Sequence, residues 1–172
     1  MPLWLRATLF VLVVPGAVGG WVPWRLARAD ALDAPWPVRA LGVLALLAGW
    51  GVLLWCVRDF VRRGRGTPAP YDPPAVLVTG GLYDVVRNPM YVGVLLAIAG
   101  WGLWYGSGRV LFYWASVAAA FHLVVTLFEE PVLARTFGAP YDGYRARVPR
   151  WIPRWRTRDD ARDHPPTDTE DR

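Results

Sequence analysis

The amino-acid sequence predicts an all-α integral membrane protein: a bundle of about four transmembrane helices followed by a cytoplasmic interfacial C-terminal segment. Two observations carry this prediction. Hydrophobic residues make up 54% of the 172 residues, and they gather in blocks instead of spreading evenly. Eleven tryptophans are present, many of them near block ends, where amphipathic rings favour the membrane–water interface. The blocks, and hence the expected spans, cover residues 3–24, 38–57, 90–105 and 110–128.

Three of the four blocks approach the roughly 20 residues that a helix needs to cross a bilayer. The third is shorter, and we expect it to borrow a turn from Asn88 and Pro89 or to lie in a locally thin membrane. The expected domain is residues 1–158, the membrane domain. Residues 159–172 lack large apolar side chains and are expected to form a disordered polar tail.

The first block allows a second interpretation, a signal peptide, because Arg6 precedes an apolar run that ends in small residues. The run continues through Trp21-Val22-Pro23-Trp24, which favours an uncleaved span. Pro15 is expected to kink this helix, since proline removes a backbone donor and crowds the preceding turn.

Two of the expected helices carry small residues at helical spacing, which lets another helix approach closely. A short glycine-rich connection at residues 105–109 joins the third and fourth blocks, so we expect those two helices to form an antiparallel hairpin. The small-residue faces are Gly42, Leu46 and Gly49 in the second block and Gly93, Ala97 and Gly100 in the third.

All 19 basic residues are arginines, which together with the Ala, Gly and Pro content indicates a GC-rich, bacterial source. In an up-down-up-down topology only Arg25, Arg28, Arg39 and Arg109 lie opposite the termini and the middle loop. The positive-inside rule therefore predicts a multi-pass cell-membrane protein with both termini cytoplasmic. The arginine-rich C-terminal segment predicts contact with anionic membrane lipids, and nucleic acid binding is not expected.

Polar residues interrupt the apolar pattern at two places. Arg87-Asn88-Pro89-Met90-Tyr91 runs into the third block, and Glu129-Glu130-Pro131 follows the fourth, where we expect the helix to end. Pro89 suits the first helical turn, with Asn88 as its cap. Polar groups at a membrane boundary are costly to keep and usually mark function.

The fourth block also carries a polar stripe. His122, Thr126 and Glu130 follow at intervals of four, and Glu129 lies two turns after His122, so all four share one side of the helix. Lipid would not tolerate that side, which should face the bundle interior. We expect His122 to be an interhelical hydrogen-bond partner, with a catalytic base as the alternative.

These groups fit methyl transfer from S-adenosyl-L-methionine, which carries a sulfonium, an ammonium and a carboxylate. The reaction is an in-line displacement at carbon, and most of the catalysis can come from holding the reacting atoms in line. Useful protein groups are carboxylates for the ammonium or ribose, a cation for the carboxylate and aromatic rings near the sulfonium. No metal is needed, and with Cys56 as the single cysteine no cysteine-based metal site or intrachain disulfide can form.

The order and spacing of several motifs resemble the isoprenylcysteine carboxyl methyltransferase family, over roughly residues 76–153. Asn88-Pro89-Met90-Tyr91 with Gly93, and Glu129-Glu130-Pro131, equally resemble the related phosphatidylethanolamine N-methyltransferases. The matching positions are Leu77-Val78-Thr79-Gly80-Gly81-Leu82-Tyr83, Arg87 to Gly93, Glu129-Glu130, Phe137-Gly138, Tyr141, Tyr144, Val148 and Pro153.

The resemblance implies a membrane methyltransferase that takes S-adenosyl-L-methionine from the cytosol and a lipophilic or lipid-linked acceptor from the bilayer. It implies Glu129 and Glu130 as catalytic residues. Gly49-Trp50-Gly51 can correspond to a cofactor Gly-x-Gly of the phospholipid enzymes, although such tripeptides are common. The implied cofactor-binding residues are Gly81, Leu82, Tyr83, Arg87, Asn88, Pro89, Tyr91, Gly93, Glu129 and Glu130.

Two departures from the family pattern matter. Many relatives have His where this chain has Asn88, and an amide cannot carry charge at neutral pH. The isoprenylcysteine enzymes have an arginine for the substrate carboxylate shortly before the paired acids, where this chain has residues 125–128, Val-Thr-Leu-Phe. A prenyl-cysteine carboxylate is therefore in doubt as the acceptor.

Structural roles are the alternatives for the same residues. The paired glutamates could be a solvated helix end next to Arg135, Arg87 a topological anchor, and Tyr83 and Tyr91 interface residues. Tyr141, Tyr144 and Cys56 are expected to serve packing. For the whole protein the alternatives are a catalytically inactive membrane scaffold or sensor, and a reductase-like enzyme, for which no dinucleotide fingerprint is present.

Overall fold

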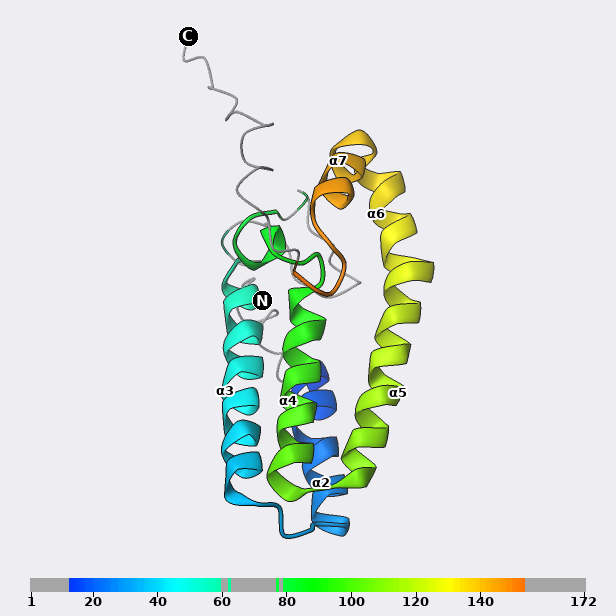
Figure 1. Ribbon diagram of the computed structural model, residues 1–172. Coiled ribbons are helices and arrows are strands. Elements are labelled where there is room, and N and C mark those ends of the chain that lie inside the picture. Colours follow the sequence, from blue (N-terminus) through cyan, green and yellow to red (C-terminus); the bar gives the residue numbers. More distant parts are fainter. Residues whose placement is uncertain (1–12, 60–61, 63–76, 78, 154–172) are drawn as a thin grey trace.

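The computed structural model describes residues 13–59, 62, 77 and 79–153, and all regular structure within those residues is helical (Figure 1). Long helices lie side by side, and short helices gather at the end of the bundle where α4 begins. The start of the first expected span, most of the middle loop and the expected disordered tail lie outside the described residues.

The first helix is described from residue 13 and runs through the π turn η1 (Ala17–Trp21) into α2 (Val22–Ala29), past the expected end of the span at residue 24. The π turn follows Pro15, the site of the expected kink. The N–H of Val22 donates to the carbonyl of Ala17, and Pro23 comes next. Because Pro23 has no N–H, the carbonyl of Val18 needs another donor, and the Tyr113 hydroxyl supplies it at 3.1 Å.

Helices α3 (Trp36–Asp59) and α4 (Pro89–Tyr105) have the expected bounds within two residues and pack closely along their lengths. The two predicted small-residue faces meet each other. A Cβ at Gly49 would lie 2.6 Å from the backbone nitrogen of Ala97, and one at Gly42 would lie 2.7 Å from that of Trp104. Real side chains do not approach this closely, so glycine is what allows the contact.

The hairpin between α4 and the following helix is confirmed. Gly106 adopts a left-handed conformation at φ 61°, and the Ser107 side chain accepts a hydrogen bond from the N–H of Val110 at 3.2 Å. Asp30 braces this turn, because it accepts hydrogen bonds from the Ser107 hydroxyl and, at 3.0 Å, from the N–H of Arg109.

The fourth helix does not end at Glu129-Glu130, which corrects the sequence prediction. Helix α5 (Gly108–Val124), the π turn η4 (Val125–Glu129) and α6 (Glu130–Phe137) form one helix of 30 residues. The π turn lets it pass Pro131: the N–H of Glu130 donates to the carbonyl of Val125, and proline follows. The same arrangement precedes Pro23 in the first helix.

Within the described part of the chain two helices are long and apolar enough to cross a membrane, α3 and the helix of residues 108–137, and α4 is a shorter apolar helix. Many of their large apolar side chains are exposed, as lipid contact requires. The count of four spans stays a prediction. Examples of exposed side chains are Leu44, Leu47, Leu54, Phe112, Leu127 and Phe128.

Replacing Gly49 by alanine should destabilise the protein by about 1–3 kcal/mol, the usual cost of overpacking, because the added Cβ forces α3 away from α4. Denaturation of the purified protein in detergent measures this. Gly51→Ala is the matched control on the same helix, since nothing lies within 4 Å of its added Cβ. It should be neutral or stabilising by up to about 1 kcal/mol. Equal stability of the two variants would contradict the close helix contact.

Asp30 predicts a pH dependence of stability. The hydrogen bond from Ser107, and next the one from the N–H of Arg109, hold the pKa of this carboxyl below its usual value. A lowered folded-state pKa stabilises the fold above the unfolded-state pKa of about 3.9, and that stabilisation is lost as pH falls through the folded-state value. The Tm of the wild type should therefore drop more between pH 6 and pH 3 than that of Asp30→Asn. Parallel Tm curves would show that the Asp30 contacts add nothing to stability.

Candidate active site

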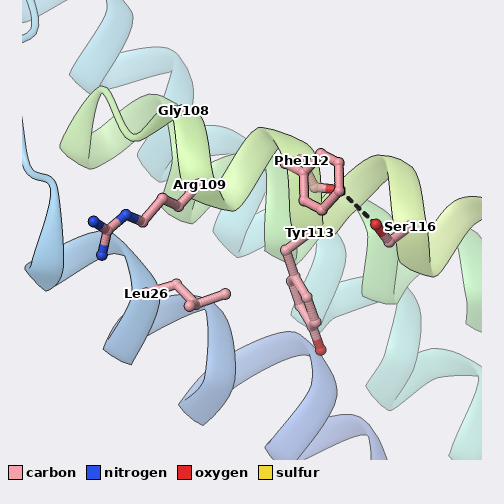
Figure 2. Close-up of a pocket in the computed structure, with 6 residues that line it drawn as sticks. All are labelled: Leu26, Gly108, Arg109, Phe112, Tyr113 and Ser116. Carbon is pink, nitrogen blue, oxygen red and sulfur yellow. Dashed lines mark hydrogen bonds between the residues drawn. The ribbon is translucent and has the colours of Figure 1, made fainter.

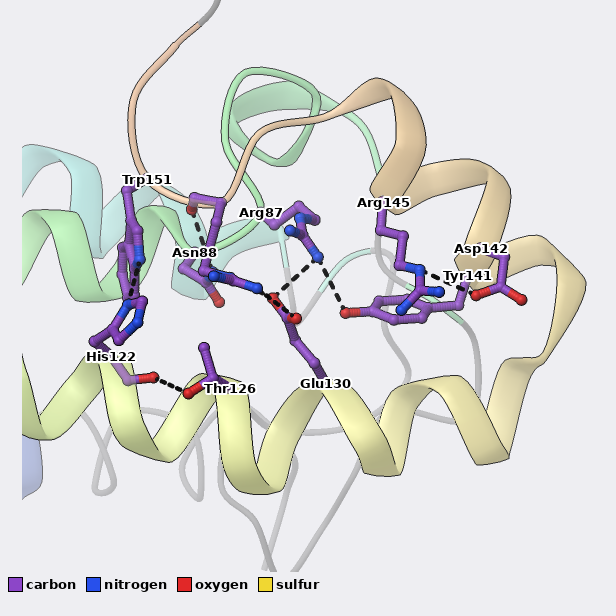
Figure 3. A network of polar contacts seen from close by, with 10 residues as sticks. Arg87, Asn88, His122, Thr126, Glu130, Tyr141, Asp142, Arg145 and Trp151 are labelled. Atoms are coloured by element: carbon purple, nitrogen blue, oxygen red, sulfur yellow. Dashed lines mark hydrogen bonds and ion pairs between the residues drawn. The ribbon is translucent and has the colours of Figure 1, made fainter.

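The candidate site lies where α4 begins, under a C-terminal segment that folds back over it (Figures 1 and 3). Helix α7 (Ala139–Arg147) follows α6 after a turn at Gly138, which has a positive φ of 57°. Residues 148–153 then return across the start of α4, where the N–H of Arg87 donates to the carbonyl of Pro149 at 2.8 Å.

Two tyrosines of α7 hold the segment in place. Tyr141 and Tyr144 are buried in a cluster with Val148, as expected of packing residues. The Tyr144 hydroxyl donates to the carbonyl of Tyr83 at 2.7 Å. Burial raises the pKa of both phenols, so they stay neutral at physiological pH.

Glu130 is the centre of an ion-pair cluster (Figure 3). Its carboxylate accepts two hydrogen bonds from Arg150, at 2.7 Å from Nε and 2.8 Å from Nη2, a bidentate geometry that is among the strongest in proteins. Arg87 Nη1 lies 3.0 Å from the same carboxylate and 3.4 Å from the Tyr141 hydroxyl. The side chains of Glu130 and Arg87 are only 14% and 12% exposed, so these two charges are largely shielded from water. The cluster connects the helix of Glu130, the residues before α4 and the C-terminal segment.

Asn88 adds a further contact to the same segment. It stands at the N-cap position of α4, yet its side chain makes no capping hydrogen bond, contrary to expectation. The amide donates instead to the carbonyl of Arg150 at 3.2 Å. Asn88 therefore ties the backbone of the C-terminal segment to α4.

Glu129 has different partners from its neighbour. The Tyr91 hydroxyl donates to its carboxylate, and the Tyr91 ring packs against Phe121 with centroids 4.4 Å apart. Trp151 approaches Tyr91 edge-on at 6.3 Å. Glu129 thus lies beside a group of aromatic rings, whereas Glu130 is neutralised by arginines.

His122 contacts the C-terminal segment, in agreement with a hydrogen-bonding role. The Trp151 indole N–H donates to His122 Nδ1 at 3.3 Å. Figure 3 shows His122, Thr126 and Glu130 on one side of the helix, as predicted. His122 itself is exposed and not in the bundle interior, and the Thr126 hydroxyl donates to the carbonyl of His122 in its own helix at 2.7 Å.

An apolar groove with a cavity volume of about 480 Å³ runs between α4 and α5 and reaches His122 and Trp151. Trp114 closes part of it, with its indole N–H donating to the carbonyl of Leu95 at 3.1 Å. The remaining lining residues are Val92, Leu96, Ala99, Ala118 and Ile152.

A second cavity of similar volume lies at the opposite end of the helix pair, between α2 and α5 (Figure 2). Leu26, Phe112 and Tyr113 line it together with Arg109 and Ser116, and the Ser116 hydroxyl donates to its own helix. No acidic side chain lines this cavity among the described residues, so it offers less chemistry than the cluster around Glu129 and Glu130.

The structure brings together five of the predicted cofactor residues: Arg87, Asn88, Tyr91, Glu129 and Glu130. The other five are spread over the turn before α4 and α4 itself, and their cofactor role stays a prediction. Gly81, Leu82 and Tyr83 form the 3₁₀ turn η3 (Gly81–Asp84) against the end of α3, near buried Cys56. Pro89 begins α4 and Gly93 serves the contact with Gly49, while Gly51 has open space around it.

Three residues of the site were missed by sequence reasoning. Arg150, and not Arg135, pairs with Glu130, and nothing in the local pattern separates it from the neighbouring arginines. Trp151 looked like one of many interfacial tryptophans. Asp59, the last residue of α3, is 3% exposed, accepts a hydrogen bond from Trp55 at 3.1 Å and lies against Gly81. The expected span ended at residue 57 and so did not include it. Among the described residues no cluster of His, Cys, Asp and Glu could hold a metal ion.

Replacing Arg150 by glutamine should loosen the C-terminal segment, because Glu130 loses its bidentate partner. We expect the segment to lose roughly 1.5–3 kcal/mol of local stability, the range for a hydrogen bond to a charged group. Amide hydrogen exchange of residues 145–153 measures this. Arg145→Gln is the control, since Arg145 forms an exposed pair with Asp142 that contributes little. Unchanged exchange in Arg150→Gln would show that the tyrosine cluster alone holds the segment.

Comparison with known proteins identifies the family. Residues 38–140 match the phospholipid methyltransferase family. Methanethiol S-methyltransferase 2 of Bradyrhizobium diazoefficiens is 42% identical over 87 residues, which is 49% of this chain and 32% of that protein. Protein-S-isoprenylcysteine O-methyltransferase of Schizosaccharomyces pombe is 35% identical over 78 residues, 45% of this chain and 33% of that protein.

A third relative is the cobalt-zinc-cadmium resistance protein CzcN of Cupriavidus metallidurans, 32% identical over 114 residues, 66% of this chain and 48% of that protein. The chain thus spans about a third to a half of the length of these curated relatives. With more than half of its residues matching the family model, the chain belongs to the phospholipid methyltransferase family, to which the isoprenylcysteine methyltransferases are related.

Proposed function

We propose that the protein is an integral membrane, S-adenosyl-L-methionine-dependent methyltransferase that acts on a lipophilic or lipid-linked acceptor. Family membership and relatives named as methyltransferases support the reaction type. The observation that carries the proposal is the position of Glu129, a carboxylate that accepts a hydrogen bond from Tyr91, whose ring packs against Phe121 and against Trp151, a residue that also lines the apolar groove.

The residues present fit the cofactor. Glu129 is only partly exposed and has no cationic partner among the described residues. The ammonium group of a ligand would supply the counter-charge that this carboxylate lacks. Tyr91, Phe121 and Trp151 are aromatic side chains, whose ring faces attract a sulfonium cation. When bound, S-adenosyl-L-methionine supplies a methyl carbon whose bonding electrons stay on sulfur, leaving a neutral thioether, while the acceptor's lone pair forms the new bond.

The arginine cluster suggests separate roles for the paired acids. Glu130 positions the C-terminal segment through Arg150, and so indirectly holds Trp151 beside Tyr91. Arg87 has a buried Nε without a hydrogen-bond partner in the described part of the chain, which leaves one donor for a ligand carboxylate. Glu129 remains for ligand contact and for taking the acceptor's proton.

We further propose a multi-pass bacterial membrane protein with both termini in the cytoplasm. The arginine distribution supports this orientation, and two of the three relatives are bacterial proteins. The cofactor would then reach the site from the cytosol, because the start of α4 lies at the end of the bundle that follows the middle loop.

Titration calorimetry with S-adenosylhomocysteine, which keeps the ammonium, tests the proposal on purified protein in detergent. Glu129→Gln should weaken binding by roughly 1.5–3 kcal/mol, about 10- to 150-fold, because the ammonium loses a charged partner. Asp142→Asn is the control, an exposed acid on α7 that should leave the affinity unchanged. Absence of saturable binding by the wild type would favour an inactive scaffold or sensor, and unchanged affinity in Glu129→Gln would place the cofactor elsewhere.

A further inference from the structure

The groove between α4 and α5 differs from the candidate cofactor site in charge. Along the described lining no aspartate, glutamate, lysine or arginine is present, and His122 is the one ionisable group. A charged ligand would lose its hydration there without gaining a counter-charge, which costs several kcal/mol. The groove therefore suits an uncharged occupant, and its volume of about 480 Å³ lies within the 300–1,000 Å³ range of small-molecule sites.

Trp151 belongs to both the groove and the candidate site. It lines the groove, lies edge-on to Tyr91 at 6.3 Å and donates its indole N–H to His122. Arg150, the preceding residue, is fixed by the bidentate pair with Glu130. The position of this indole is thus set from two directions, and its contact with Tyr91 connects the apolar groove with the partner of Glu129.

The hydrogen bond from Trp151 also fixes the state of His122. Because Nδ1 accepts, the neutral ring carries its proton on Nε2. In this tautomer the Nε2–H of His122 can donate a hydrogen bond to a ligand. Its role next to the groove is therefore to orient a polar end.

Small side chains at Ala99 and Ala118 leave width between the two helices for a ligand. The exposed apolar surface of α5 continues from the groove, so a ligand dissolved in the bilayer can enter sideways. Within the same helix, residues 125–128 supply no basic group for a ligand carboxylate.

We propose, building on the proposed function, that the methyl acceptor is an uncharged nucleophile on an apolar chain, that it binds in the groove between α4 and α5, and that Trp151 and His122 determine which acceptors fit. The polar end meets the His122 N–H at the end of the groove that Trp151 lines, and Trp151 in turn contacts Tyr91, the partner of Glu129. Ordinary bilayer acyl chains are the competing occupants.

Photo-crosslinking in nanodiscs tests this without requiring methyl transfer. The probes are a dodecanol and a dodecanoate that carry the same chain diazirine. The alcohol should label peptides of α4 and α5 at least tenfold more than the carboxylate. Ala118→Leu fills the groove and should abolish this labelling, whereas Ala119→Leu, an exposed neighbour on the same helix, should not. Equal labelling by both probes, or equal labelling of both variants, would overturn the proposal and indicate a lipid-exposed surface only.

Substitution of Trp151 separates specificity from folding. Trp151→Ala should let a branched-chain alcohol probe label the groove, while Trp151→Phe should keep the wild-type preference for the straight chain. No change of preference in Trp151→Ala would exclude a specificity role. S-adenosylhomocysteine affinity is measured on Ala118→Leu and Ala119→Leu. If both bind it normally, a failure of crosslinking counts against the groove alone and leaves the proposed methyltransferase function standing.

Discussion

The ion pairs of Glu130 hold three segments of the chain together, because a largely buried carboxylate is costly unless charged partners satisfy it. Arg87 comes from the start of α4, Arg150 from the C-terminal segment and Glu130 from the long helix of residues 108–137. Removing any one partner would leave a poorly solvated charge, which is far costlier than the net gain of forming the pair. The cluster therefore specifies where the C-terminal segment lies, and Asn88 and Trp151 take their positions from it.

Two π turns adapt the helices to their prolines. In each, the residue before proline donates its N–H to the carbonyl five positions earlier. The proline, which has no N–H to donate, therefore follows directly after a widened turn. The consequence in the fourth helix is that the helix continues through Glu129 and Glu130 instead of fraying at them. A fixed helix presents adjacent residues about 100° apart, which gives the two acids separate surroundings.

The local sequence pattern predicted most of the helices and their packing. It predicted little of how the C-terminal segment contacts the candidate site. Apolar runs predicted the positions of α3 and α4, and the spacing of Gly42, Gly49 and Gly93 predicted that these helices pack closely. Each of these signals lies within a short stretch of sequence, so it can be recognised without the structure. The helix end at Glu129 was wrong because Pro131 reads as a terminator unless the preceding turn is known. Arg150 and Trp151 meet partners 20 and 29 residues away, and such pairs leave no periodic signal.

The aromatic group around Tyr91 couples the two halves of the proposed site. Trp151 lines the groove and also approaches Tyr91, which holds Glu129, so a ligand that moves the indole changes the surroundings of the carboxylate. Glu130 limits that motion, because its pair with Arg150 anchors the residue next to the indole. On the proposed function, acceptor and cofactor would therefore bind interdependently, with free energy passing through Trp151 and Tyr91. Linkage makes such an effect reciprocal, so a filled groove should change cofactor affinity by the same factor as the bound cofactor changes acceptor affinity.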